Sequence, residues 1–465
     1  MSRQGQRYRQ HASTLALSSF LALGVVLAGC SSSTDALDGA TPSEPAESSP
    51  APDAGASDQT NDLPDGSPIT PPSTTLAEES NLADLSIAAD LAGLIAFRDG
   101  NGDLVTSRPD GTQATVWASG DQFANSQPTW SATGEQLAWT AIGPEGPTLA
   151  ITSVGSADTE AVSFTPVASP QFYLSWSPDN TWIASLGNGP TGIELTIFES
   201  AAGEQRVVGP GQPFFTDWSS NGTIVAAIGG QALVDINAND LAANQRNLDA
   251  QLGIFSTPVA LSETEAIVAL RNGPNNEIVR LDGSTSSVLG AANGPVALSL
   301  NPQMSQLAVL VIETPDPEAQ TIAFAQPAAP SLPAGVVSII DLETGAVVSR
   351  PEQDILSMRW SPDGNHLALL ESTPDGLTWL FADPATATAE PTRSATFFPS
   401  QEFANSYLPF ADQYDRSTTE WSPNSQAFVF SGTVNDTAGV WIDVIDDDLG
   451  PAQLSNGDIA FWSPN

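Results

Sequence analysis

The sequence predicts an all-β fold, a closed β-propeller built from four-stranded blades. The first observation is a recurring phrase in which a Trp is followed by a tight polar turn and then by an apolar strand. The phrase begins at Trp130, Trp176, Trp218, Trp360 and Trp421, and a last copy begins at Trp462. The second observation is the spacing, because intervals of about 40–60 residues are typical of blade repeats. The third is that no segment shows a helical period of useful length.

The residue types within each phrase explain its turn and its strands. In Trp176-Ser-Pro-Asp-Asn180 and Trp360-Ser-Pro-Asp-Gly364, Pro presets φ and Asp or Asn bonds back to the backbone, while Gly tolerates positive φ. Between the turns lie short runs rich in Val, Ile, Leu, Phe and Trp, which favour strands. Each repeat is therefore predicted to form four short strands joined by turns.

The number of blades follows from two degenerate copies and the two ends of the chain. Val259-Ala-Leu-Ser262 and Val296-Ala-Leu-Ser-Leu300 keep the pattern without the Trp. Leu94-Ile-Ala-Phe97 lacks a leading strand, whereas Ile459-Ala-Phe-Trp462 is a leading strand with nothing after it. Pairing these two segments completes one blade and closes the ring, which removes open sheet edges. The count is then eight blades, with seven as the alternative if one degenerate copy is misread.

Residues 1–29 have the pattern of a lipoprotein signal peptide. Three arginines are followed by an apolar run, Leu15 to Leu27, that is too short to span a bilayer comfortably. The run ends in Leu27-Ala-Gly-Cys30, which resembles a bacterial lipobox, in which the Cys thiol is acylated and the chain is cut before it. We therefore expect lipidated Cys30 to anchor the mature chain to a membrane. The alternative is a plain secreted protein in which this cysteine occurs by chance.

Residues 30–90 are predicted to be a disordered linker, and residues 91–465 the propeller. The linker is rich in Ser, Pro and acidic residues, and with no aromatic residue it cannot bury enough apolar surface to fold. The whole chain has 13 basic against 54 acidic residues, a net charge of −41. Such a charge repels phosphate backbones, which argues against nucleic acid as a partner.

The Trp-Ser-Pro-Asp-Gly turn followed by Leu-Ala or Ile-Ala resembles the PD40 repeat of TolB-like propellers. The resemblance spans most of residues 91–465, and five internal copies keep the Trp. It implies a propeller fold and a place in the cell envelope, periplasmic or cell-surface. TolB itself has six blades and an extra N-terminal domain, so the resemblance implies fold and location more strongly than a role in the Tol system.

Residues that suggest catalysis or metal binding are few. His366 is the only histidine left after processing, so neither a Ser-His-Asp triad nor a histidine-rich zinc site is expected. Asp99, Asn101 and Asp103 have the alternating oxygen spacing of a calcium loop, but Leu104 replaces the usual Gly, and an ordinary hairpin turn is favoured. We predict no cofactor.

Two insertions interrupt the repeats, at about 313–335 and 384–418. The second contains Phe403, Tyr407, Phe410 and Tyr414, which are candidate partner contacts because aromatic loops are common at interfaces. Alternatively, these rings pack down on the propeller or cap its channel. We expect a monomeric binding or scaffolding module of the envelope with a protein partner. Two alternatives stay open: a hydrolase or lyase that cuts an extracellular polymer through channel carboxylates, and a sensory lipoprotein that regulates a membrane receptor.

Overall fold

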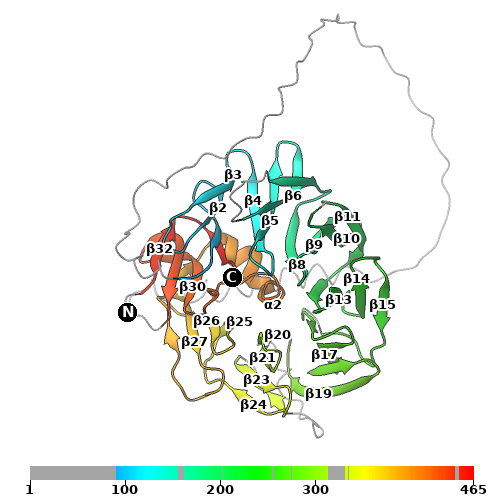
Figure 1. Cartoon of the computed structure of the whole chain (residues 1–465). Helices are drawn as coiled ribbons and strands as arrows, with labels where there is room; N and C mark the ends of the chain where they lie inside the picture. Colours follow the sequence, from blue (N-terminus) through cyan, green and yellow to red (C-terminus); the bar gives the residue numbers. More distant parts are fainter. Residues whose placement is uncertain are drawn as a thin grey trace, which may run out of the picture.

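The computed structural model describes residues 91–465 except 155–161, 202, 254–255, 274, 313–329, 334 and 446–449. The described residues form a ring of eight blades around a central axis (Figure 1). The prediction of an eight-bladed propeller is therefore confirmed. Cys30, the signal peptide and the linker lie outside the described residues, and the expectations for them stay predictions. Within the described ranges no helix is both long and apolar enough to cross a bilayer.

Each blade is an antiparallel sheet whose strands follow one another from the axis outward. Blade 1 contains β33 (Ile459–Trp462), β1 (Ile95–Arg98), β2 (Leu104–Ser107) and β3 (Thr115–Ala118). Blade 2 contains β4 (Ala124–Trp130), β5 (Gln136–Gly143), β6 (Gly146–Ser153) and β7 (Ser163–Pro166). Blade 3 contains β8 (Gln171–Trp176), β9 (Trp182–Gly189), β10 (Gly192–Glu199) and β11 (Gln205–Gly211). Blade 4 contains β12 (Phe214–Trp218), β13 (Thr223–Ile228), β14 (Ala232–Asn237) and β15 (Ala243–Arg246).

The other half of the ring follows the same order. Blade 5 contains β16 (Val259–Ala260), β17 (Glu265–Asn272), β18 (Asn275–Asp282) and β19 (Thr285–Ala292), with β22 (Ser331–Leu332) added in parallel at its outer edge. Blade 6 contains β20 (Val296–Leu300), β21 (Gln306–Val311), β23 (Val337–Asp341) and β24 (Val347–Ser349). Blade 7 contains β25 (Ile355–Trp360), β26 (Leu367–Thr373), β27 (Gly376–Ala382) and β28 (Thr392–Arg393). Blade 8 contains β29 (Phe398–Pro399), β30 (Ala427–Val434), β31 (Thr437–Val444) and β32 (Ala452–Ser455).

Both ends of the described chain meet in blade 1, as the sequence predicts. β33 pairs antiparallel with β1, and Ile95 lies opposite Trp462. The pairing continues past the strands, because the Ser463 backbone N–H donates to the Leu94 carbonyl at 2.7 Å and the Leu94 N–H donates to Ser463 Oγ at 2.8 Å. The ring is thus closed by hydrogen bonds between two distant segments rather than by a continuous chain.

In blades 2, 3, 4, 7 and 8 the recurring Trp joins its blade to the one before it. The indole N–H of Trp176 donates to the carbonyl of Thr129 at 3.0 Å, and Thr129 immediately precedes Trp130 in the preceding blade. Four more pairs repeat this contact between neighbouring blades: Trp130 with Phe461, Trp218 with Ser175, Trp360 with Ser299, and Trp421 with Arg359. In each of these pairs the indole therefore supplies a hydrogen-bond donor for a backbone carbonyl of the neighbouring innermost strand.

The turns that follow each Trp all lie on one face of the ring, because the innermost strands run in the same direction. We call this the turn face. Within one such turn Ser177 Oγ donates to Asp179 Oδ1 at 2.6 Å, and the same carboxylate oxygen accepts the Thr181 N–H at 3.0 Å. Although burial raises the pKa of Asp179, these hydrogen bonds outweigh it and lower that pKa below its ordinary value. The predicted bonding of Asp back to the backbone is therefore observed.

Candidate functional site: a plugged channel and an adjoining pocket

The central channel is filled by a segment that leaves the innermost strand of blade 8. Pro399 pairs with Gly432, and Trp421 forms a bridge with Phe428. Between these two pairs the innermost strand advances 22 residues while β30 advances 4, so the innermost strand carries 18 additional residues. We call residues 401–418 the plug. Figure 1 shows its helix α2 (Ala411–Tyr414) near the centre of the ring.

The plug is helical, although the sequence shows no helical period. It contains a π-helical turn η4 (Phe403–Tyr407), a 3-10 turn η5 (Leu408–Phe410) and then α2. The hydrogen-bond pattern changes twice within these few residues, so no single repeat length applies to the side chains. The segment also meets strands on several sides of the channel, which removes the apolar-polar stripe of a surface helix.

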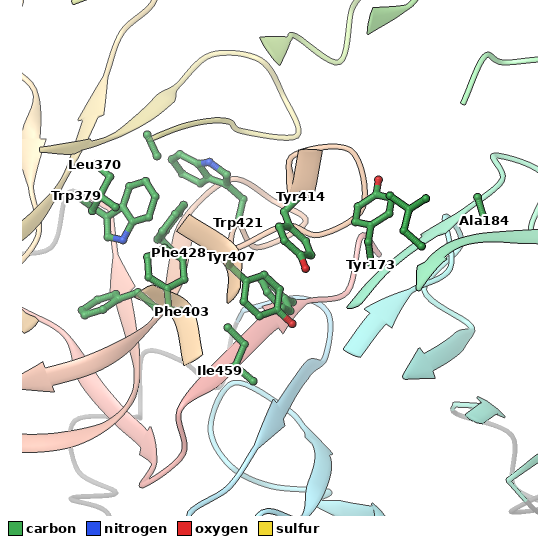
Figure 2. Packing of buried hydrophobic residues seen from close by; sticks show 14 of the residues in the cluster. Tyr173, Ala184, Leu370, Trp379, Phe403, Tyr407, Tyr414, Trp421, Phe428 and Ile459 are labelled. Carbon is green, nitrogen blue, oxygen red and sulfur yellow. The ribbon is translucent and has the colours of Figure 1, made fainter. Parts of the chain in front are cut away.

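One side of the plug packs through aromatic rings against blades 1 and 3 (Figure 2). The Tyr407 ring centroid lies 5.1 Å from that of Phe461 and 4.4 Å from that of Tyr414, which in turn lies 5.5 Å from that of Tyr173. The Tyr414 hydroxyl donates to the carbonyl of Phe172. Burial raises the pKa of Tyr173 to about 12 and raises the pKa values of Tyr407 and Tyr414 well above the ordinary value, so all three rings stay neutral.

The other side of the plug bonds to the backbone of blade 4. Gln413 is 3% exposed, and its amide completes the channel edge of β12. Gln413 Oε1 accepts the Thr216 N–H at 2.9 Å, and Gln413 Nε2 donates to the Thr216 carbonyl at 2.8 Å. One side chain thus supplies both partners that a neighbouring strand would otherwise provide.

Further polar contacts connect the plug to blades 5, 6 and 7. Each pairs a plug group with an innermost strand or the segment leading into it. The contacts are Asp412 Oδ2 with the Thr257 N–H at 3.0 Å, Arg416 Nη2 with the Leu298 carbonyl at 2.7 Å, Asp415 Oδ2 with Ser299 Oγ at 2.6 Å, and the Ala411 carbonyl with Arg359 Nη1 at 2.9 Å. The plug is therefore tied to the ring in several directions, and it occupies the channel as part of the fold.

Charged groups gather around the plug, and they already form ion pairs and hydrogen bonds within the protein. Arg359 Nε lies 3.1 Å from Glu420 Oε2, and the two side chains are 5% and 4% exposed. Arg416 Nε lies 3.8 Å from Asp217 Oδ2, which also accepts the Ala260 N–H at 2.8 Å. Burial raises the pKa values of Asp217 and Glu420 above the ordinary range, and nearby arginines only partly offset this effect. Both carboxylates are therefore already paired with arginines, Glu420 with Arg359 of β25 and Asp217 with Arg416 of the plug itself.

An open pocket of about 200 Å³ lies on the turn face, next to the point where the plug returns to blade 8. Its walls come from blades 1, 2 and 3, and its floor comes from the end of the plug. The lining residues are Trp130, Ser131, Ala132, Trp176, Asp415, Arg416, Ser417, Thr418, Thr419, Trp462 and Pro464. Since the plug fills the channel itself, we take this pocket as the candidate binding site.

The aromatic residues predicted as partner contacts lie mostly inside the molecule. Phe403, Tyr407 and Tyr414 are 8%, 2% and 4% exposed, and Phe410 is half-buried. The structure thus corresponds to the alternative in which the rings cap the channel. Partner contact by these four residues stays a prediction. The rings of Phe403, Tyr407 and Tyr414 are buried, so a partner would not reach them without a rearrangement of the plug.

The candidate calcium loop has the geometry of a hairpin turn. Asp99 Oδ1 accepts the backbone N–H groups of Asn101 and Asp103, both at 2.9 Å, and Asp103 Oδ1 accepts the Gly120 N–H at 2.6 Å. The carboxylate oxygens thus hold the backbone of the turn. In the part of the chain that the structure describes, no group of three or more His, Cys, Asp or Glu is placed to hold a metal ion.

Comparisons with known proteins agree on the fold and go no further. No family model and no curated protein sequence matches the chain. Among solved structures, dihydro-heme d1 dehydrogenase NirN in complex with DHE has a TM-score of 0.54 at 11% identity, covering 80% of this chain and 75% of that one. A eukaryotic initiation factor has a TM-score of 0.50 at 12% identity, covering 80% and 98%. TolB from Acinetobacter baumannii has a TM-score of 0.36 at 12% identity, covering 78% and 79%.

At these identities the two similarities with TM-scores of 0.50 and 0.54 show the fold alone.

Proposed function

We propose that this protein is a lipid-anchored β-propeller on the outer side of a bacterial membrane, where it acts as a binding or scaffolding module of the cell envelope. The observation that supports this role is the plug. It occupies the channel with contacts to blades 1, 3, 4, 5, 6 and 7, so the faces and the rim of the ring are what a partner meets. A rigid ring with a filled centre is suited to holding other molecules in place.

The anchor follows from the chemistry of the first 90 residues. Acyl chains on Cys30 would each add about 0.8 kcal/mol of membrane affinity per buried methylene. As a random coil, residues 31–90 would average roughly 40–45 Å end to end. That length would hold the ring away from the membrane surface and leave its faces free for partners.

The rival role as a polymer-cleaving enzyme has less support from the geometry. General acid-base catalysis needs two titratable groups within reach of the same substrate bond. Asp217 and Glu420 already accept hydrogen bonds and pair with Arg416 and Arg359. An enzyme that used these groups would have to break those pairs first.

Replacing the cysteine tests the anchor. We expect the wild-type protein in the membrane pellet and Cys30→Ser in the soluble fraction, because the variant cannot be acylated. Immunoblotting of fractionated cells measures the distribution. Retention of Cys30→Ser in the pellet would contradict lipid anchoring.

The soluble variant then tests the binding role. A component that co-purifies with the wild-type protein from detergent-solubilised membranes should bind purified full-length Cys30→Ser saturably and with fixed stoichiometry. Turnover of an envelope polymer without a stable complex would instead favour the enzyme.

A further inference from the structure

A small cavity lies where the plug interrupts the innermost strand of blade 8. On one side of it the Ser400 N–H donates to the Ser431 carbonyl at 3.2 Å, and on the other the Val429 N–H donates to the Glu420 carbonyl at 2.8 Å. Opposite Phe430, between these two bonds, the chain has turned away from β30 into the plug. The cavity there has a volume of about 10 Å³, and its walls come from blades 1, 7 and 8 and from the plug.

Three polar side chains line this cavity, and two of them have no hydrogen-bond partner among the described residues. These two are the indole N–H of Trp379 and the hydroxyl of Ser431, whose residues are 1% and 4% exposed. Figure 2 shows the Trp379 nitrogen on the side of its ring that faces Phe403, another residue of the cavity wall. Because buried donors without a partner are costly and rare, we expect a partner for them inside the cavity.

The third polar side chain is Glu420, which supplies an acceptor. Its Oε2 already accepts from Arg359 Nε at 3.1 Å. The two oxygens of a carboxylate have about four lone-pair positions, so Glu420 keeps accepting capacity after that bond. The cavity therefore combines a donor, an acceptor and a hydroxyl that can act as either.

This combination selects a small neutral molecule that both accepts and donates hydrogen bonds. The indole N–H of Trp379 can only donate, so it disfavours a cation as occupant. An anion would meet the Glu420 carboxylate in a protein whose net charge is −41. The size fits one water molecule, because roughly 10–15 Å³ is enough to hold one and buried waters typically make about three hydrogen bonds.

We infer that this cavity binds one water molecule, which accepts from the Trp379 indole, donates to Glu420 and bonds to the Ser431 hydroxyl. The water connects blade 7 through Trp379, blade 8 through Ser431, and the segment by which the plug returns to the ring through Glu420. It gives both unpaired groups a partner at the point where the innermost strand is interrupted. This water belongs to the fold and does not depend on the proposed binding role.

NMR of full-length Cys30→Ser with isotope-labelled tryptophan tests the inference. The Trp379 indole proton should show a cross-peak at the water frequency with opposite signs in NOE and ROE spectra, as expected beside a bound water. Proton exchange with bulk water would give the same sign in both. Trp379→Phe assigns the signal, because one indole peak is lost while a ring still packs on Phe428, 4.7 Å away between centroids in the wild type. Absence of the cross-peak, or the same sign in both spectra, would overturn the assignment.

Trp139 is the matched control within the same sample. Its indole N–H is also buried without a hydrogen-bond partner among the described residues, but Trp139 does not line this cavity. We therefore expect no water cross-peak from Trp139. An equal cross-peak from both indoles would show that the signal does not report the cavity, and the assignment would fail.

Ser431→Ala separates a bound water from the serine hydroxyl, whose exchanging proton would produce the same signal beside the indole. In this variant the water keeps Trp379 and Glu420 as partners, so the cross-peak should persist. Its disappearance would mean that the hydroxyl was the source, and the water would be rejected.

Discussion

The two sides of the plug hold the channel by different means. Toward blades 1 and 3 the contact is made by tilted and edge-on rings, with Tyr407 and Tyr414 at its centre (Figure 2). Toward blades 4, 5 and 6 it is made by side chains such as Gln413 and Asp412, which bond to buried backbone groups of β12 and of the segment leading into β16. Ring packing contributes much free energy with little directional preference, whereas paired hydrogen bonds fix position. We therefore expect the aromatic side to stabilise the plug and the polar side to set its register.

The largest loss of stability is expected from a substitution on the aromatic side of the plug. Tyr407→Ala should lower the free energy of unfolding by about 3–5 kcal/mol, because a buried ring is replaced by a cavity. Chemical denaturation followed by fluorescence measures the loss. Tyr407→Phe is the matched control, since the Tyr407 hydroxyl is buried without a hydrogen-bond partner in the structure and its removal should cost nothing. A loss below about 1 kcal/mol in Tyr407→Ala would mean that ring packing does not stabilise the plug.

A smaller loss is expected on the polar side. Gln413→Met keeps the length of the side chain but leaves the Thr216 N–H and carbonyl without their partner. Burying such unpaired groups costs about 1–3 kcal/mol, which the same denaturation measurement resolves. Gln426 is exposed on the turn face, and Gln426→Met should stay within about 0.5 kcal/mol of the wild type. If the two variants behave alike, the amide does not set the register.

The smallest effect is a dependence on pH that only the polar side should show. Burial raises the pKa of Asp412 in the folded state, and hydrogen bonds from Thr257 only partly offset this. The folded protein then holds this proton more tightly than the unfolded chain. The associated stability is fully present below the unfolded pKa near 3.9 and is lost as pH rises through the folded pKa.

Asp412→Asn tests this sign. The variant keeps an oxygen that can accept the Thr257 N–H but cannot titrate. Its free energy of unfolding should fall less steeply than that of the wild type as pH rises above the unfolded pKa near 3.9. Tyr407→Phe should retain the wild-type dependence of unfolding free energy on pH. If Asp412→Asn shows the same dependence as the wild type, the Asp412 carboxyl does not contribute to it.

The blades could be predicted from the sequence because their signals are local. Each Trp, its turn and its strand lie within a few residues, and even the copies with Leu261 and Leu300 in place of Trp take the expected position. The closure of blade 1 was predictable because an unpaired strand was left at each end of the repeat series. These features need only turn chemistry and strand alternation.

The plug and the pocket could not be predicted in the same way. Gln413 bonds to a residue 197 positions earlier, and Tyr414 to one 242 positions earlier. Contacts over such separations exist only once the ring has closed, and nothing in the local sequence of the insertion encodes them. The available signal was the aromatic content of residues 384–418, which indicated either a contact surface or a cap without deciding between them.

The seam between β1 and β33 constrains how each copy of the protein matures. Arg98 of β1 and Asp458, just before β33, are joined by side-chain hydrogen bonds across 360 positions of the chain. At about 5–20 residues per second, a ribosome needs roughly 20–70 s to travel between them. Throughout that interval the apolar edge of β1 has no strand beside it, and such edges invite aggregation. Any product cut short before the last strand keeps this edge open, which would mark unfinished copies for chaperones and proteases.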